Sequence, residues 1–186
     1  MYTASGEMTR RATLAAAGSV FVGAALAGCS AVGKAAGVGV PVNELTVDSD
    51  SMDPTIVKGA VITVDGVTPG SYRPRHQDIV VIHPTAEYSG MQPSALVIRR
   101  VVGIPGDMVS CAGTGSPLML NGVALKEPYL YAGDAPSTIM FDVKVAADCL
   151  WLLGDHRAIA LDCRYHLDDP DHGAIPLSNV VGVYHR

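Results

Sequence analysis

Short runs of valine, isoleucine and leucine, separated by glycine, proline and aspartate, limit most strongly how this chain can fold. The clearest runs are GAVITVDG (59–66), DIVVIHP (78–84), ALVIRRVVG (95–103) and CLWLLG (149–154). Runs of this length with such boundaries indicate strands. Since the sequence has no heptad repeat and no long amphipathic helix, it predicts a mainly β fold with a curled or barrel-like sheet.

The turn residues refine this prediction. Glycine and proline supply 20 and 12 of the 186 residues, which fits a turn-rich β domain. Asn121-Gly122 stands between LML and VAL and predicts a two-residue hairpin, because both turn positions must accept positive φ. Asp65-Gly66 and Pro105-Gly106 predict further turns. We also expect a smaller strand-rich insertion between about Asp107 and Val145, and a short helix beginning at SMDP (51–54), where proline suits the first turn.

The N-terminal segment has the pattern of an export signal. Arg10 and Arg11 precede the uncharged stretch ATLAAAGSVFVGAALA (12–27), whose 16 residues fall short of the roughly 20 that a membrane-spanning helix needs. The following LAGC (26–29) resembles the lipobox of bacterial lipoproteins, which predicts a signal peptide at residues 1–28 and a lipid on Cys29. The arginine pair also fits a twin-arginine signal. The alternative is a chance cysteine after an ordinary cleavage site.

Composition limits the partners of the mature chain. Residues 29–44 are small and almost uncharged, so they predict a flexible tether that leaves residues 45–186 as the folded domain. A lipid on Cys29 would hold this domain at the outer face of the bacterial cell membrane. The formal net charge of the full 186-residue chain is -5, which offers no basic footprint, and we expect no nucleic-acid partner.

The cysteines and the acidic residues leave alternatives open. Outside the cytoplasm one disulfide plus one free thiol is expected among Cys111, Cys149 and Cys163, and Cys111 with Cys149 is slightly favoured over the other two pairings. The acidic segment DDPDH (168–172) is either a metal site or, as we favour, a solvated acidic turn. We expect no metal and no cofactor.

Four segments together resemble the conserved boxes of bacterial type I signal peptidases, in order and spacing. They are DSDSMDPTIVKG (48–59), QDIVVIHP (77–84), IRRVVGIPGDMV (98–109) and LLGDHRAIALDCRYH (152–166). GDHR (154–157) and the tail LDDPDHGAIPLSNVVG (167–182) look like the actinobacterial branch. The likeness runs from about Val47 to Val183, and it implies the signal peptidase I fold.

The resemblance implies a serine peptidase site with one altered position. Ser51 matches the nucleophile, and the backbone N–H of Ser51 with the hydroxyl of Ser49 matches the oxyanion hole. The family's base is a neutral lysine, in the Ser-Lys variant of the triad logic. Its position is Arg99 here, and arginine cannot be deprotonated in proteins, so the expected base is missing.

The third box departs from the family pattern in the same place. GDNRxxSxDSR reads GDHRAIALDCR: the serine that would orient the lysine is Ala160, and the second serine is Cys163. The retained charged residues are mainly structural in the family, and we expect Asp162 to pair with Arg164 or Arg99. These retained residues are Asp155, Arg157, Asp162 and Arg164.

Two functions from different classes follow. The first is a membrane-anchored serine endopeptidase that removes signal peptides from exported preproteins. Another base would then have to come from Lys58, His83 or His156. The second is a non-catalytic lipoprotein that binds exported peptides or regulates a true signal peptidase. In both, an extended peptide would add as a strand to a sheet edge. The chemistry of Arg99 and Ala160 favours impaired or absent proteolysis.

Overall fold

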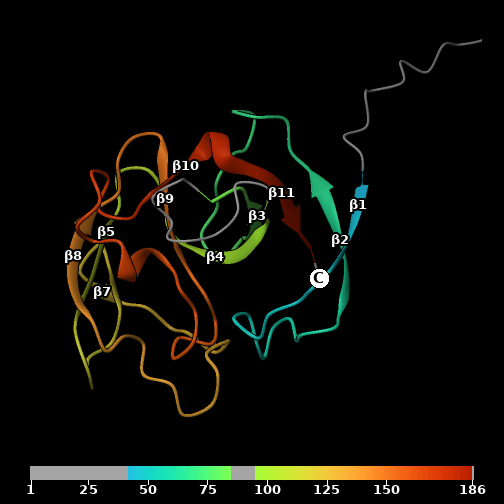
Figure 1. Cartoon of the computed structure of the whole chain (residues 1–186). Coiled ribbons are helices and arrows are strands. Elements are labelled where there is room, and N and C mark those ends of the chain that lie inside the picture. Colours follow the sequence, from blue (N-terminus) through green and yellow to red (C-terminus); the bar gives the residue numbers. More distant parts are fainter. Residues whose placement is uncertain (1–41, 85–94, 186) are drawn as a thin grey trace, which may run out of the picture. The chain divides into compact units, whose positions relative to one another are not determined.

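The fold is mainly β, as predicted. The computed structural model describes residues 42–84 and 95–185. They form two antiparallel sheets, a main sheet and a small sheet (Figure 1). The main sheet has the order β1 (Val42–Thr46), β2 (Val61–Gly66), β11 (Val180–Tyr184), β3 (Ile79–Ile82), β4 (Val97–Gly103), β9 (Cys149–Leu153) and β10 (Ile175–Pro176). The small sheet has the order β7 (Val123–Ala124), β6 (Met119–Leu120), β5 (Met108–Ala112) and β8 (Met140–Lys144). The described helices are the 3-10 turns η1 (Cys163–Tyr165) and η2 (Leu177–Asn179).

The apolar runs form strands because they can be covered on both faces. All four residues of β3 and all five of β9 are buried, which is the pattern of strands enclosed on both sides. One core cluster lies around Trp151 of β9 and includes Val109 and Val143 of the small sheet. The two sheets therefore share a hydrophobic core.

A second core cluster anchors the segment that carries the predicted nucleophile. Met52 and Ile56 are almost fully buried and pack with Ile62 of β2 and with Ile79 and Val81 of β3. Burying an apolar side chain of this size contributes about 1.5 to 3 kcal/mol. Apolar packing on both sides of Ser51 thus fixes a turn that has little regular secondary structure.

Several sequence predictions are confirmed. Each of the four apolar runs contains a strand, and the small sheet β5–β8 fills the insertion expected between Asp107 and Val145. Asn121 and Gly122 connect β6 to β7 with φ values of 52° and 78°, so both turn positions lie in the left-handed region. Pro105-Gly106 is also a turn. β1 begins at Val42, inside the range 29–44 that was expected to be a tether.

Three predictions are wrong. Residues 51–56 form turns instead of a helix: the bond from Ile56 N to Met52 O (2.9 Å) is of the helical type, but no second bond of this type follows it before the chain leads toward β2. Asp65-Gly66 is no turn, because it ends β2 and pairs with Val183 and Gly182 of β11. The favoured disulfide between Cys111 and Cys149 does not form, since all three described cysteines are free thiols.

The cysteines occupy separate buried places. Cys111 lies on β5 with its sulfur near the carbonyls of Gly113 and Ser116, whereas Cys149 begins β9. Burial and the neighbouring Asp148 raise the pKa of Cys149 to about 11. The predicted signal peptide, Cys29 and most of the predicted tether lie outside the described residues. Within residues 42–84 and 95–185, no helix is long and apolar enough to cross a membrane.

Candidate functional site

Ser51 lies in the turn that follows β1, and its side chain is largely buried. Its residual exposure is 7%, and its carbonyl accepts a hydrogen bond from the amide of His156 at 3.1 Å. That bond joins the turn to the loop that follows β9. Two segments about 100 residues apart in the sequence thus hold the serine in place.

Arg99 of β4 reaches the hydroxyl of Ser51 directly. Its Nη1 donates to Ser51 Oγ at 2.9 Å and to the carbonyl of Ile98 at 2.7 Å, and its Nη2 donates to the carbonyl of Leu161 at 2.7 Å. The side chain is buried, with 4% exposure, and its Nε has no hydrogen-bond partner among the described residues. The residue at the expected lysine position therefore contacts the expected nucleophile, and it does so as a cationic donor.

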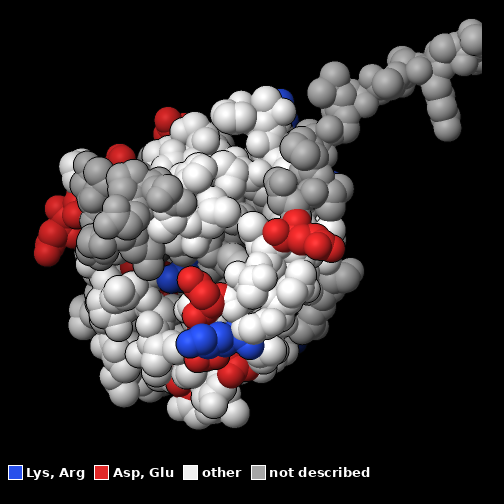
Figure 2. All heavy atoms as spheres, turned by 45° about the vertical axis from the view of Figure 1, so that its right-hand side comes forward, with Lys and Arg blue, Asp and Glu red and all other residues white. Residues whose placement is uncertain are grey.

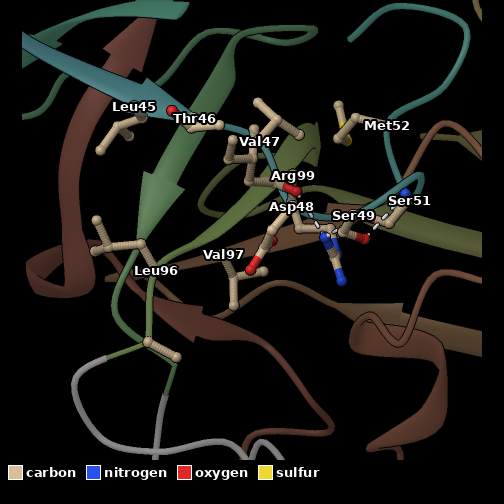
Figure 3. Close-up of a pocket in the computed structure, with 12 residues that line it drawn as sticks. Leu45, Thr46, Val47, Asp48, Ser49, Ser51, Met52, Leu96, Val97 and Arg99 are labelled. Carbon is tan, nitrogen blue, oxygen red and sulfur yellow. Dashed lines mark hydrogen bonds between the residues drawn. The ribbon is translucent and has the colours of Figure 1, made fainter. Parts of the chain in front are cut away.

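The two groups expected to form an oxyanion hole bind each other. The amide of Ser51 donates to the hydroxyl oxygen of Ser49 at 3.2 Å (Figure 3). Ser49 is exposed, so its hydroxyl can rotate away when a ligand arrives. The arrangement can supply two donors to one oxygen only after this bond opens.

A cavity of about 480 Å³ leads to these residues. Figure 3 shows Leu45 and Leu96 at one end and Ser49, Ser51 and Arg99 at the other. The walls come from two stretches of chain, the one that leaves β1 and the one that enters β4. Its lining residues are Leu45, Thr46, Val47, Asp48, Ser49, Ser51, Met52, Ala95, Leu96, Val97, Ile98 and Arg99.

Among the described residues, one edge of β1 and one edge of the start of β4 have no strand partner along this cavity. β1 is an edge strand that pairs with β2, and β4 pairs with β9 only from Arg100 onward, so the start of β4 is paired with β3 on one side. In the sheet order β1 and β4 are separated by three strands, and the sheet must curl for both to line one cavity. Such a gap between two strand edges can accept an extended peptide.

The loop after β9 supports the site through buried ion pairs. Arg164 donates to Asp162 from Nε and Nη2, both at 2.8 Å, and Asp162 also accepts the amide of Gly154 at 3.0 Å. Arg157 pairs with Glu127 and donates to the carbonyl of Gly154 at 2.9 Å. Of the two partners expected for Asp162, the structure has Arg164 and not Arg99.

Asp155 forms the third ion pair of this region. It accepts from Arg100 Nε at 2.7 Å and from the hydroxyl of Thr55, and the Arg100 guanidinium also lies over the ring of Tyr129 at 3.9 Å. Arg99 and Arg100 are neighbours on β4, so they point to opposite faces of the strand. Arg99 faces Ser51, whereas Arg100 faces Asp155.

Ala160 and Cys163 stand where the family pattern has serines. A Cβ added to Gly154 would lie 2.3 Å from Ala160 Cβ and 2.7 Å from Ser51 O, so the loop passes very close beneath the serine. Ala160 offers no hydroxyl there. The sulfur of Cys163 accepts the amide of Leu152 at 3.1 Å, and burial raises the pKa of this thiol.

The alternative bases do not reach the nucleophile. Lys58 and His83 are exposed, and the ring of His156 stacks on Tyr131 with 3.8 Å between ring centroids. Within the described part of the chain, no lysine or histidine hydrogen-bonds the hydroxyl of Ser51, whose side-chain partner is Arg99. Arg99 thus occupies the place from which a base would act.

Sequence reasoning missed four contributors to the site: Thr55, Arg100, Glu127 and Leu161. A sequence signal for the role of Arg100 was present. Side chains alternate along a strand, so adjacent arginines lie on opposite faces and each needs its own partner. Glu127 lies in the connection between β7 and β8 of the small sheet, and no local pattern links it to Arg157. The Leu161 contact uses a backbone carbonyl, which the residue type does not reveal.

The described residues give no sign of a metal site, and the face shown in Figure 2 carries no broad basic surface. They hold no group of three or more histidine, cysteine, aspartate or glutamate residues that could bind a metal, and this includes the acidic segment 168–172. On the face shown in Figure 2, basic side chains do not gather, and the few visible ones lie beside acidic side chains.

Comparison with known proteins identifies the family. A signal peptidase I of Leptolyngbya laminosa is 32% identical over 138 residues, covering 73% of this chain and 63% of that protein. A probable signal peptidase I of Mycobacterium leprae is 29% identical over 188 residues, covering 73% of this chain and 64% of that protein. This chain thus spans less than two thirds of each relative.

A solved structure and a family model complete the comparison. The crystal structure of a signal peptidase I from Enterococcus faecalis is similar at 25% identity and a TM-score of 0.45, covering 60% of this chain and 97% of its own. The family model described as "Signal peptidase, peptidase S26" matches residues 19–185, which is most of the sequence. The chain therefore belongs to the signal peptidase family, peptidase S26.

Proposed function

We propose that this chain binds the signal peptides of exported preproteins and that its proteolytic activity is impaired or absent. The observation that carries the proposal is the hydrogen bond from Arg99 Nη1 to Ser51 Oγ at 2.9 Å. A serine hydroxyl becomes a nucleophile when a neighbouring base removes its proton. Arg99 instead donates to that oxygen, and a guanidinium with a pKa above about 12 accepts no proton near neutral pH.

The second support is the loss of the group that would orient a base. Ala160 is 1% exposed and lies against Gly154, which is also close to the carbonyl of Ser51. With an arginine as donor and an alanine in the position of the supporting serine, the described residues supply Ser51 with neither a proton acceptor nor a partner that would orient one. The two changes concern one step of the reaction, the removal of the proton from Ser51.

The third support is the cavity between β1 and β4. Its walls combine unpaired strand edges with the side chains of Leu45, Leu96 and Val97. Main-chain hydrogen bonds at such edges give affinity, and the pockets for alternate side chains give specificity. This suits the extended segment of a signal peptide that ends in small residues. A lipid on Cys29 would place the cavity at the outer face of the membrane, where such peptides emerge.

The alternative role is regulation of a true signal peptidase by the same binding. A domain that holds a signal peptide without cutting it would compete with an active enzyme for the peptide. Binding without cleavage is common to both roles, so it is tested first.

The test combines binding with product analysis. Full-length protein is titrated into a labelled signal peptide with an Ala-x-Ala site, and anisotropy reports binding while mass spectrometry reports cleavage. We expect binding without cleavage, and we expect Leu96→Asp to weaken binding because it puts a charge into the apolar end of the cavity. The control is Val123→Asp, which makes the same kind of change at an exposed position of β7 in the small sheet.

Two results would refute the proposal. Absence of binding to the wild-type protein would remove the peptide-binding role. Cleavage by the wild type that disappears in Ser51→Ala would show a working peptidase with an unexpected base.

A further inference from the structure

The described domain buries four arginines, and their partners differ. Three of them form an ion pair with a carboxylate: Arg100 with Asp155, Arg157 with Glu127, and Arg164 with Asp162. Arg99 is as deeply buried as these, yet among the described residues its partners are two backbone carbonyls and the hydroxyl of Ser51. Arg99 is thus the buried arginine without a paired carboxylate in the described part of the chain.

An unpaired buried cation is costly, because removal from water costs free energy that an opposite charge must offset. Three carbonyl or hydroxyl oxygens satisfy part of the guanidinium's hydrogen-bonding capacity but none of its charge. Asp48 also lines the cavity, but it is exposed and lies beyond ion-pair distance from Arg99. The cavity therefore carries a fixed positive charge at its polar end.

The hydroxyl of Ser51 adds a donor at the same place. Its oxygen accepts from Arg99, so its own proton remains available for another acceptor. The described part of the chain supplies no acceptor for that proton among its side chains, and the hydroxyl faces the cavity that Arg99 and Ser49 also line. A cation and a hydroxyl donor side by side form a site for a carboxylate.

We propose that Arg99 makes this cavity a receptor for the free C-terminal carboxylate of an extended peptide. The residues before the carboxylate would lie between the edges of β1 and β4, with small side chains toward Leu45 and Leu96. The inference rests on the proposed peptide-binding function and specifies its ligand. A cleaved signal peptide, rather than an uncut preprotein, is then the preferred ligand, because cleavage creates a carboxylate at the position facing the nucleophile.

The test uses four peptides with one apolar sequence ending in Ala-x-Ala. The first has a free C-terminal carboxylate, the second a C-terminal amide, the third continues for ten residues, and the fourth is an amide whose last residue is aspartate. Affinities for the full-length protein are measured by anisotropy. A charge-assisted hydrogen bond supports an expectation that the acid binds at least about tenfold more tightly than the amide.

Two variants and a control locate the effect. Arg99→Gln is expected to reduce the preference for the acid to within about twofold, because the fixed charge is gone. Arg99→Lys is expected to keep part of the preference, since an ammonium remains a cation but loses the planar fork. Arg73→Gln removes the same charge at an exposed position between β2 and β3, outside the cavity, and is expected to keep the full preference.

The outcomes separate this inference from the proposed function. Equal binding of acid and amide to the wild type would overturn the inference while leaving peptide binding intact, and this comparison needs no variant to fold. Binding of the continued peptide or of the aspartate-ending amide as tightly as the acid would also overturn it. If no peptide binds the wild type, the proposed function itself fails and the inference fails with it.

Discussion

The neighbouring residues Arg99 and Arg100 lie on opposite faces of β4 and have different kinds of partners. On one face Arg100 contacts Asp155, Thr55 and the ring of Tyr129. Its positive charge is thus paired with a carboxylate inside the protein. On the other face Arg99 donates to neutral oxygens and lines an open cavity. The paired face supports the fold, and the unpaired face is available to a ligand. What distinguishes Arg99 from Arg100 is therefore not burial but the adjoining cavity and the lack of a paired carboxylate among the described residues.

The largest effect is expected from breaking the paired face. Asp155→Asn leaves the Arg100 guanidinium buried without its carboxylate, and such a change typically costs about 3 to 5 kcal/mol. We expect a loss of this size in the free energy of unfolding, measured with urea. Asp48→Asn, at an exposed position that lines the cavity, should change it by less than about 0.5 kcal/mol. Equal losses in the two variants would contradict the comparison.

A smaller effect is expected on the unpaired face. Arg99→Gln removes hydrogen bonds to the carbonyls of Ile98 and Leu161, but it also removes an uncompensated buried charge. These contributions oppose each other, so we expect a net loss of about 1 to 2 kcal/mol. Unfolding of both variants in one urea series measures the difference. If Arg99→Gln destabilised the protein more than Asp155→Asn, Arg99 would be a structural residue and the distinction between the two faces would fail.

The smallest effect concerns Asp107, at the junction of the two sheets. Burial would raise the pKa of Asp107, but hydrogen bonds from Asn121 (2.8 Å), His76 (2.7 Å) and the amide of Ile104 (2.9 Å) outweigh it and lower the pKa below its usual 3.8. A lowered pKa means that the native state holds the ionised form more strongly than the unfolded state does. Its contribution to stability is therefore complete above about pH 4 and is lost as the pH falls through the lowered value.

Asp107→Asn tests this contribution. At pH 7 we expect a loss of about 1 kcal/mol in the free energy of unfolding, and below pH 4 the gap between variant and wild type should close. Unfolding of both proteins between pH 2 and pH 7 provides the measurement. A gap that stays constant over this range would show that the charge of Asp107 contributes nothing.

The sequence predicted most of the fold because local patterns determine it. Short valine and isoleucine runs gave the strands, and Asn121-Gly122 gave the hairpin of the small sheet through its requirement for positive φ. The prediction from sequence failed where the local pattern and the tertiary packing disagree. Proline at position 54 suits a helix start, but apolar packing of Met52 and Ile56 holds a turn instead. The cysteine spacing carried no information on which sulfurs meet, and the three described cysteines form no disulfide with one another.

The site could be predicted as a set of residues but not as a set of contacts. The motifs identified Ser49, Ser51 and Arg99, and the structure brings them together at one end of a cavity. The bond between Ser49 and Ser51, and the donation from Arg99 to Leu161 O, depend on backbone geometry that residue types do not encode. The absence of a carboxylate beside Arg99 among the described residues required the structure, because the sequence allowed Asp162 as its partner.

The central claim is that one step, proton removal from Ser51, is blocked because an arginine occupies the position of the base. The most direct measurement is cleavage of a signal-peptide substrate by the wild type, by Ser51→Ala, and by the double variant Arg99→Lys with Ala160→Ser, which supplies a base and its hydroxyl partner. We predict no cleavage by the first two proteins and serine-dependent cleavage by the double variant. Cleavage by the wild type that is lost in Ser51→Ala would contradict the claim, because the serine would then be activated despite Arg99.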